Sequence, residues 1–65
     1  MKILVNDEEH EVADDLTVAG LLDRMGYPAK GIAVAVDWAV IPRSDWHTTL
    51  SEGARIEVVT AVQGG

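Results

Sequence analysis

Five short stretches of this chain show strand patterns, in which apolar residues alternate with polar ones or large aliphatic residues alternate with alanines, or which form short apolar runs. β-Branched side chains dominate several of them and suit a pleated, half-buried surface. The predicted strands are residues 1–5, 10–12, 32–36, 39–41 and 55–62. Asn6–Glu9 supplies turn residues for a hairpin between the first two strands. Asp37-Trp38 predicts a second turn, although Trp suits the positive φ of such turns poorly.

One amphipathic helix is predicted around residues 17–25. Its apolar stripe, at helical spacing, consists of Val18, Leu21, Leu22 and Met25. Thr17 is a favourable N-cap, and Gly26 suits the left-handed conformation that ends a helix. Gly20 inside this helix costs up to about 1 kcal/mol relative to Ala, and only close packing explains it.

The order strand, strand, helix, strand, strand, strand predicts a two-layer α+β domain with the helix on one face of the sheet. The predicted core consists of Met1, Ile3, Val5, Leu21, Leu22, Met25, Val34, Val36, Ile56 and Val58. Trp46, in a short helical turn capped by Ser44, is expected to close the bottom of this core. A domain of this size buries only about 60% of its unfolded surface, so its stability rests on aliphatic packing.

The composition excludes several functional classes. The chain has no Cys, so no side chain can act as a thiol nucleophile or form a disulfide. Its two His lack neighbours at metal-ligand spacing, and no nucleophile–base pair is visible, so no metal site or catalytic residue is predicted. The net charge of −6 argues against nucleic-acid binding. No apolar run is long enough for a signal or membrane segment, so we expect a cytoplasmic protein.

The last strand pattern leads into Gln63-Gly64-Gly65, which adds nothing to packing. Two glycines carry the largest conformational entropy and slightly weaken a fold. Chance or a cloning scar could produce such an ending. We favour a functional explanation, in which a tail without Cβ atoms threads into a narrow site of another protein and presents the Gly65 carboxylate. We therefore expect a folded domain over residues 1–62 and a flexible tail over residues 63–65.

A partner-contact face is predicted next to this tail. If Ile56 and Val58 point into the core, then alternate residues of the same strand point to the open face of the sheet. The predicted face consists of Leu4, Val59, Ala61 and Val62. Scattered exposed aliphatic residues are also normal on protein surfaces, so the face remains a hypothesis.

The whole chain resembles the ubiquitin-like β-grasp sulfur carriers, and within them those of thiamine biosynthesis. The similar segments are M-K-I-L-V-N, T-V-x-x-L-L, V-I-P-R-x-x-W and A-V-Q-G-G, of which the last two are the most specific. The resemblance implies a ubiquitin-like β-grasp fold with a mixed four- to five-stranded sheet and one helix packed across one face. Gly20 and Trp38 depart from the family pattern, and neither touches the tail.

The resemblance also implies a protein co-substrate that binds no cofactor of its own, and no enzyme activity. A ubiquitin-activating-like adenylyltransferase would use ATP and Mg²⁺ to adenylate Gly65. A sulfur donor, a cysteine desulfurase or an equivalent, would then produce a thiocarboxylate that thiazole synthase consumes. Three alternatives remain open: the small subunit of molybdopterin synthase, another sulfur carrier or ubiquitin-like modifier, and a non-covalent β-grasp binding module.

Overall fold

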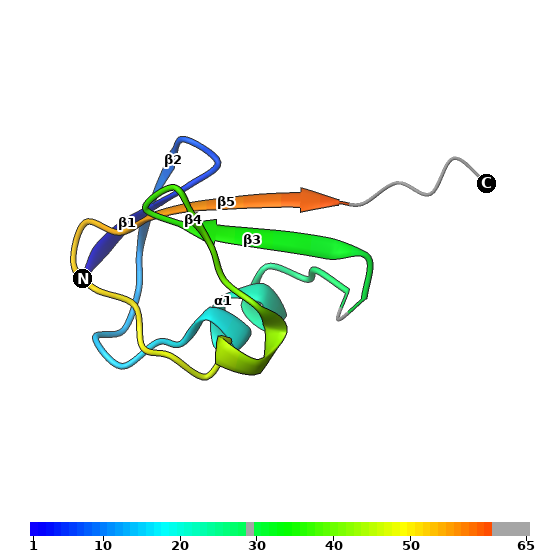
Figure 1. Ribbon diagram of the computed structural model, residues 1–65. Helices are drawn as coiled ribbons and strands as arrows, with labels where there is room; N and C mark the ends of the chain where they lie inside the picture. The colour runs from blue at the N-terminus through cyan, green and yellow to red at the C-terminus, as the bar shows by residue number, and fades with distance from the viewer. Residues whose placement is uncertain (29, 61–65) are drawn as a thin grey trace.

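A five-stranded sheet and one helix form two layers in the computed structural model, which describes residues 1–28 and 30–60 (Figure 1). The strands are β1 (Lys2–Val5), β2 (Glu8–Glu11), β3 (Ile32–Val36), β4 (Ala39–Val40) and β5 (Arg55–Thr60). The helix α1 spans Val18–Arg24, and a 3₁₀ turn, η1, spans Arg43–Asp45. The predicted order of elements is confirmed.

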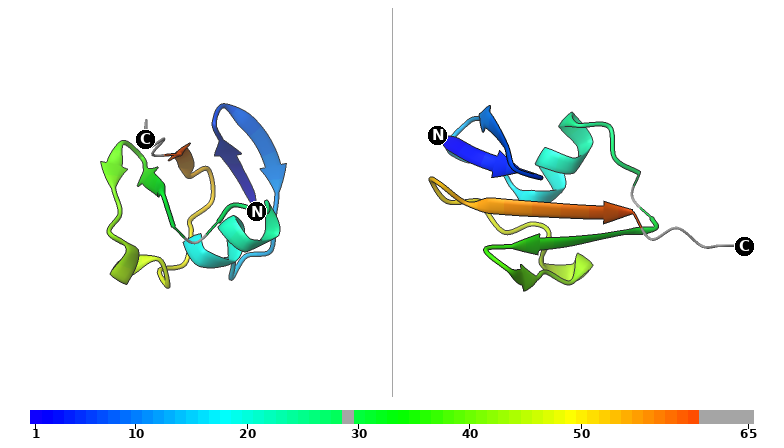
Figure 2. Two further views of the ribbon diagram at one scale, coloured as in Figure 1. Left: turned by 90° about the vertical axis from the view of Figure 1, so that its right-hand side faces the viewer. Right: turned by 90° about the horizontal axis from the view of Figure 1, so that it is seen from above.

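The sheet is mixed, and β5 is its middle strand. The strand order is β2-β1-β5-β3-β4, in which β1 and β5 run parallel and the other neighbours run antiparallel. α1 lies across one face and leaves the other face open (Figure 2). With seven residues α1 cannot span a bilayer, and no other helix in the described ranges is long and apolar enough to do so.

The first hairpin turns through Asn6 and Asp7 alone, at φ angles of 49° and 70°. β2 therefore begins at Glu8, earlier than predicted, because a two-residue turn with two positive φ angles matches the twist of the strands. The Asn6 side chain then extends the pairing of β1 with β5. Its Oδ1 accepts a hydrogen bond from the Val58 N–H at 2.8 Å, and its Nδ2 donates to the Val58 carbonyl at 3.3 Å.

The second hairpin turns at Asp37 and Trp38, with φ angles of 50° and 73°, as predicted. Contacts with the first residue of β5 explain how Trp38 is tolerated at a positive φ. The Asp37 Oδ1 accepts a hydrogen bond from the Arg55 N–H at 3.0 Å. The Arg55 guanidinium carbon lies 4.8 Å from the centroid of the Trp38 ring, within the range of a cation–π interaction.

The start of α1 explains Gly20. The Thr17 side chain accepts a hydrogen bond from the Gly20 N–H at 3.1 Å, which confirms Thr17 as the N-cap. A Cβ at position 20 would lie 3.0 Å from the Leu16 Cδ1 and 3.3 Å from the Thr17 Oγ1. A side chain at position 20 would therefore force the Leu16 and Thr17 side chains to shift by a few tenths of an ångström. Gly26, at φ 79°, follows the helix as predicted.

The core lies between α1 and the sheet. The buried residues are Ile3, Val5, Val12, Val18, Leu21, Leu22, Val34, Leu50, Ala54, Ile56 and Val58. Met1 and Val36, also predicted to be core, pack partly buried against this cluster. The prediction for Met25 is wrong, since its side chain is 36% exposed. α1 ends at Arg24 and Met25 is its C-cap. Met25 therefore lies beyond the last helical residue and does not continue the apolar stripe of the helix.

Trp46 packs against the core, half-buried, as predicted. Its indole Nε1–H donates to the Ile41 carbonyl at 3.2 Å. The prediction of Ser44 as a cap is wrong: η1 follows Pro42, and no side chain caps it. The fixed φ of Pro42 starts the turn without a capping side chain.

The amino group of Met1 lies 3.0 Å from the Asp14 Oδ1, and this hydrogen bond raises its pKa above the usual value of 8.0. A pKa raised by folding means that this contact stabilises the fold below about pH 8, and that the stabilisation disappears as the pH rises through the folded-state pKa. We therefore expect Asp14→Asn to be less stable than the parent in urea unfolding at pH 7. The difference should vanish at alkaline pH, and an equal difference at both pH values would contradict this account.

Candidate functional site

The last strand that the structure describes, β5, is the middle strand of the sheet. β5 ends at Thr60, which pairs with Ile32 at the start of β3. The predicted tail, Gln63–Gly65, and the predicted contact residues Ala61 and Val62 lie outside the described residues. The structure therefore locates Thr60, the last described residue before the predicted tail.

The open face of the sheet carries two exposed valines, with Glu57 beside Val59 on the same face of β5. Val59 is 61% exposed, and its cross-strand partner is Ala33. On the neighbouring strands Val40 is 74% exposed and pairs with Ala35. The two alanines leave a shallow surface between the two valines, and we call these four residues the valine face.

Leu4 and Val59 both lie on the open face, as predicted, but at opposite ends of β5. Leu4 is half-buried and pairs with Arg55, four residues before Val59. At about 3.3 Å per residue, that separation is about 13 Å along the strand. The structure therefore puts Val59 next to Thr60, the last described residue, and Leu4 at the other end of the strand.

Sequence reasoning missed three members of the valine face, namely Ala33, Ala35 and Val40. The signal was present, because residues 32–36 alternate large side chains with alanines. The buried side chain of Val34 shows which set faces the core, and the alanines therefore face outward. Only the strand pairing shows that Val40 and Val59 flank them.

The opposite end of the open face is polar, and non-covalent contacts of Arg55 connect its two hairpin turns. Arg55, half-buried, forms an ion pair with Asp7 and lies against Trp38. One side chain thus joins the turns of both hairpins across the start of β5. Within residues 1–28 and 30–60, no group of three His, Asp or Glu side chains is arranged to hold a metal ion.

Comparison with known sequences gives a consistent result. The chain matches the ThiS family over residues 1–65. It is 30% identical over 66 residues to the sulfur carrier protein ThiS of Escherichia coli, with both chains covered completely. It is 29% identical to a thiazole synthase of Paramagnetospirillum magneticum, where the match covers all of this chain and 20% of that protein. The chain therefore spans about one fifth of the length of that relative.

Solved structures show the same fold. A crystal structure of the thiamine biosynthesis protein ThiS from Geobacter metallireducens is similar with a TM-score of 0.85 and 26% identity, and both chains are covered completely. A solution structure of a thiamine biosynthesis protein from the same organism has a TM-score of 0.80 and 28% identity, with 100% of this chain and 88% of that chain covered. The predicted ubiquitin-like β-grasp fold is confirmed.

Proposed function

The chain belongs to the ThiS family, and on this premise we propose that it carries sulfur on the carboxyl group of Gly65 for formation of the thiazole part of thiamine. The observation that carries the proposal is the family match, which extends over residues 1–65 and so includes the Gly-Gly tail. The composition supports it independently. Because the chain has no Cys, a main-chain carboxyl group is the plausible carrier of sulfur, and no side-chain thiol competes with it.

The chemistry requires activation of this carboxylate, which is a poor electrophile because of its negative charge. An adenylating partner uses ATP and Mg²⁺ to form an acyl adenylate on Gly65 and releases pyrophosphate. The terminal sulfur of a persulfide, supplied through a cysteine desulfurase or an equivalent, then displaces AMP and forms an acyl disulfide with the donor. A second thiol of the sulfur-donating system attacks the donor's sulfur, which breaks the S–S bond, releases the thiocarboxylate on Gly65 and leaves a disulfide on the donor side. The chain acts as a co-substrate in this sequence. We propose that the exchange takes place in the cytoplasm, where ATP is available.

The partners need a surface that holds the body of the protein while the tail enters their active sites. The valine face carries two exposed valines, and one of them, Val59, precedes Thr60, the last described residue before the predicted tail. A protein named thiazole synthase contains a segment that is similar to this whole chain and makes up one fifth of its length. This arrangement supports a direct contact between this chain and a thiazole synthase. We propose that the valine face contacts both the adenylating enzyme and thiazole synthase.

Val59→Asp should weaken both associations by at least about tenfold, because it would place an unpaired charge in an apolar contact. The fold should remain intact, since the Val59 side chain is 61% exposed. Calorimetric titration of each partner provides the measurement. Ala13→Asp, at an exposed position outside the sheet, is the control with the same change in charge. Equal affinity of the Val59 variant and the parent for both partners would exclude the valine face as the contact.

The sulfur-carrier proposal itself is tested by intact mass. The protein is incubated with ATP, Mg²⁺, the adenylating enzyme and a sulfur source. We expect a mass increase equal to the replacement of one oxygen by sulfur, which fragmentation should locate on Gly65. An unchanged mass with active partner enzymes would leave a non-covalent β-grasp binding module as the better description.

A further inference from the structure

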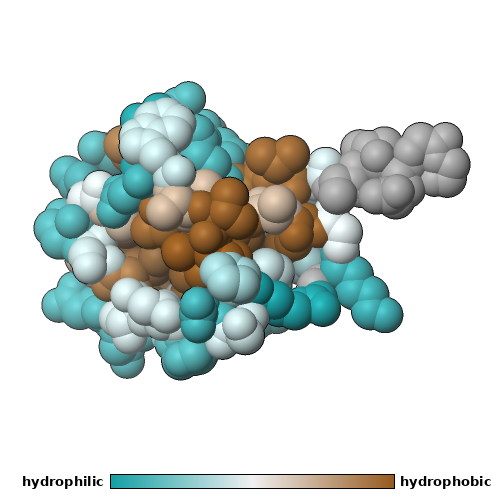
Figure 3. All heavy atoms as spheres, in the orientation of Figure 1, coloured by the Kyte–Doolittle hydropathy of each residue, from teal (hydrophilic) through white to brown (hydrophobic). Residues whose placement is uncertain are grey.

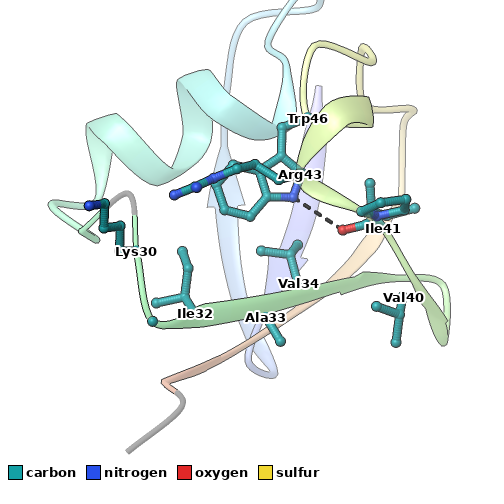
Figure 4. Close-up of a pocket in the computed structure, with 10 residues that line it drawn as sticks. Lys30, Ile32, Ala33, Val34, Val40, Ile41, Arg43 and Trp46 are labelled. Carbon is teal, nitrogen blue, oxygen red and sulfur yellow. Dashed lines mark hydrogen bonds between the residues drawn. The ribbon is translucent and has the colours of Figure 1, made fainter.

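A groove of about 350 Å³ lies between the β3–β4 edge of the sheet and η1, and its inner surface is largely apolar (Figure 4). Its apolar lining comes mainly from Ile32, Val34, Ile41 and Trp46, whereas Val40 borders the groove with its side chain directed to the opposite face of the sheet. The hydrogen bond from the indole of Trp46 to the Ile41 carbonyl fixes the aromatic wall of the groove. Seen from this side, apolar side chains form a continuous patch framed by polar ones (Figure 3).

The sheet edge along this groove is only partly covered. β4 pairs with Ala35 and Val36, and the Ile41 N–H adds one bond to the Val34 carbonyl at 2.8 Å. After Ile41 the chain turns away from the sheet into η1. Because backbone groups alternate between the two sides of a strand, those of Ile32 point to the same side as those of Val34, into the groove. Such an edge is a template for another extended chain.

One end of the groove is basic, in a protein with a net charge of −6 and only five Lys and Arg residues. Two of the five, Lys30 and Arg43, line it, and both are exposed. The Arg43 guanidinium carbon lies 5.6 Å from the centroid of the Trp46 ring. The Arg43 side chain extends toward the end where Lys30 lies (Figure 4). Neither cation forms an ion pair within the described ranges, whereas Arg55 pairs with Asp7.

A second hollow of about 230 Å³ lies beside Trp46, lined by Ala19, Leu22, Asp23, Tyr27 and Pro28 as well as Trp46 itself. It provides a useful comparison. Its charged lining residue is an acid, Asp23, and its walls come from α1 and the loop that follows, without a strand edge. The apolar wall, the strand edge and the basic end thus occur together in the first groove.

We propose that this groove binds an extended, acidic peptide segment of a partner protein. The segment pairs with the edge of β3, lays aliphatic side chains against the apolar wall, and directs carboxylates to Lys30 and Arg43. The charge of the groove selects this occupant, because a basic or neutral segment leaves both cations without a partner. Apart from Ala33 and Val40, the groove residues lie outside the valine face, and the proposal does not depend on sulfur transfer.

The test uses two N-acetylated hexapeptides, one with three aliphatic residues before three acidic ones and one with the reverse order. Each is titrated into the ¹⁵N-labelled full chain and followed by amide chemical shifts. We expect saturable shifts at Ile32, Ala33 and Val34 and at the indole N–H of Trp46 with at least one peptide. Higher salt should weaken the binding, as for any exposed charge pair.

Charge-reversed variants separate the groove from general attraction. Lys30→Glu combined with Arg43→Glu should lower the affinity at least about tenfold. Lys2→Glu combined with Arg24→Glu, the same change in net charge at exposed sites elsewhere, should change it less than about twofold. A peptide with lysines in place of the acids should not bind. The proposal is overturned by an absence of saturable shifts with both acidic peptides, by shifts that map to another surface, or by equal losses in the two double variants.

Discussion

Addition of a single residue after Gly65 is expected to abolish ATP–pyrophosphate exchange with the adenylating partner. The extension converts the carboxylate of Gly65 into a peptide bond, which cannot attack ATP in the same position. The new carboxylate lies one residue, about 3.3–3.6 Å, further along the tail. An error near 1 Å in placing a reacting group can already cost about 10²-fold in rate.

Two further variants test separately whether the length of the tail and its width determine the rate of exchange. Deletion of Gly65 withdraws the carboxylate by about 3.3–3.6 Å and should reduce exchange by at least about 10²-fold. Gly64→Val should do comparable harm, because a β-branched side chain must enter a channel suited to glycine. Gly64→Ala is the matched control, and its loss should be smaller.

The unfolding curves of all these variants should coincide with that of the parent, because glycines at the tail add no packing to the core. Undiminished exchange by the extended variant would refute the carrier function. A loss of exchange that accompanied a loss of stability would instead indicate that the tail contributes to the fold.

Leu22→Ala is expected to lower the free energy of unfolding by about 2–5 kcal/mol. Leu22 is only 4% exposed and belongs to the cluster between α1 and the sheet. Small domains unfold with a total of about 5–15 kcal/mol, so this single change removes a large share of the stability. The measurement is urea unfolding followed by circular dichroism, with equal m-values as the sign of an unchanged transition.

Two further substitutions near the same helix provide a comparison and a control for the loss of stability. Leu21 is 1% exposed, and Leu22 borders the smaller hollow beside Trp46, so Leu21→Ala should cost at least as much as Leu22→Ala. Met25→Ala should change the stability by less than about 1 kcal/mol, because its side chain is 36% exposed. Equal effects of Leu22→Ala and Met25→Ala would mean that the helix packs in a different rotation.

Local pattern was sufficient for most of the fold. The alternation over residues 32–36 predicts the observed bounds of β3, and Thr17 and Gly26 mark the ends of α1. The prediction that Met25 is buried was wrong because its spacing continues the apolar stripe of the helix. The position at which a helix ends depends on backbone hydrogen bonds, and this spacing does not show it. Leu50 and Ala54 were missed because both lie in connecting segments, where burial follows no period.

The functional surfaces depended more on tertiary structure. Val59 could be placed on the open face from alternation alone, but its proximity to Val40 required the order of β5, β3 and β4. Lys30, Arg43 and Trp46 meet at one groove although they come from separate segments, and no local pattern relates them. The role of Gly65 stays a prediction drawn from the tail and from the family, because this residue lies outside the described ranges.

The central position of β5 sets the order of events in folding. The β1–β2 and β3–β4 hairpins are local and can close within about 1–10 μs, but an isolated hairpin is marginally stable at best. They are joined only when β5 inserts between β1 and β3, and its parallel pairing brings Ile56 next to Val5 from the other end of the domain. Closing so long a loop is entropically unfavourable before any contact forms. We therefore expect the insertion of β5 to limit the folding rate. Shortening of Ile56 should then slow folding, while changes in the hairpin turns should mainly accelerate unfolding.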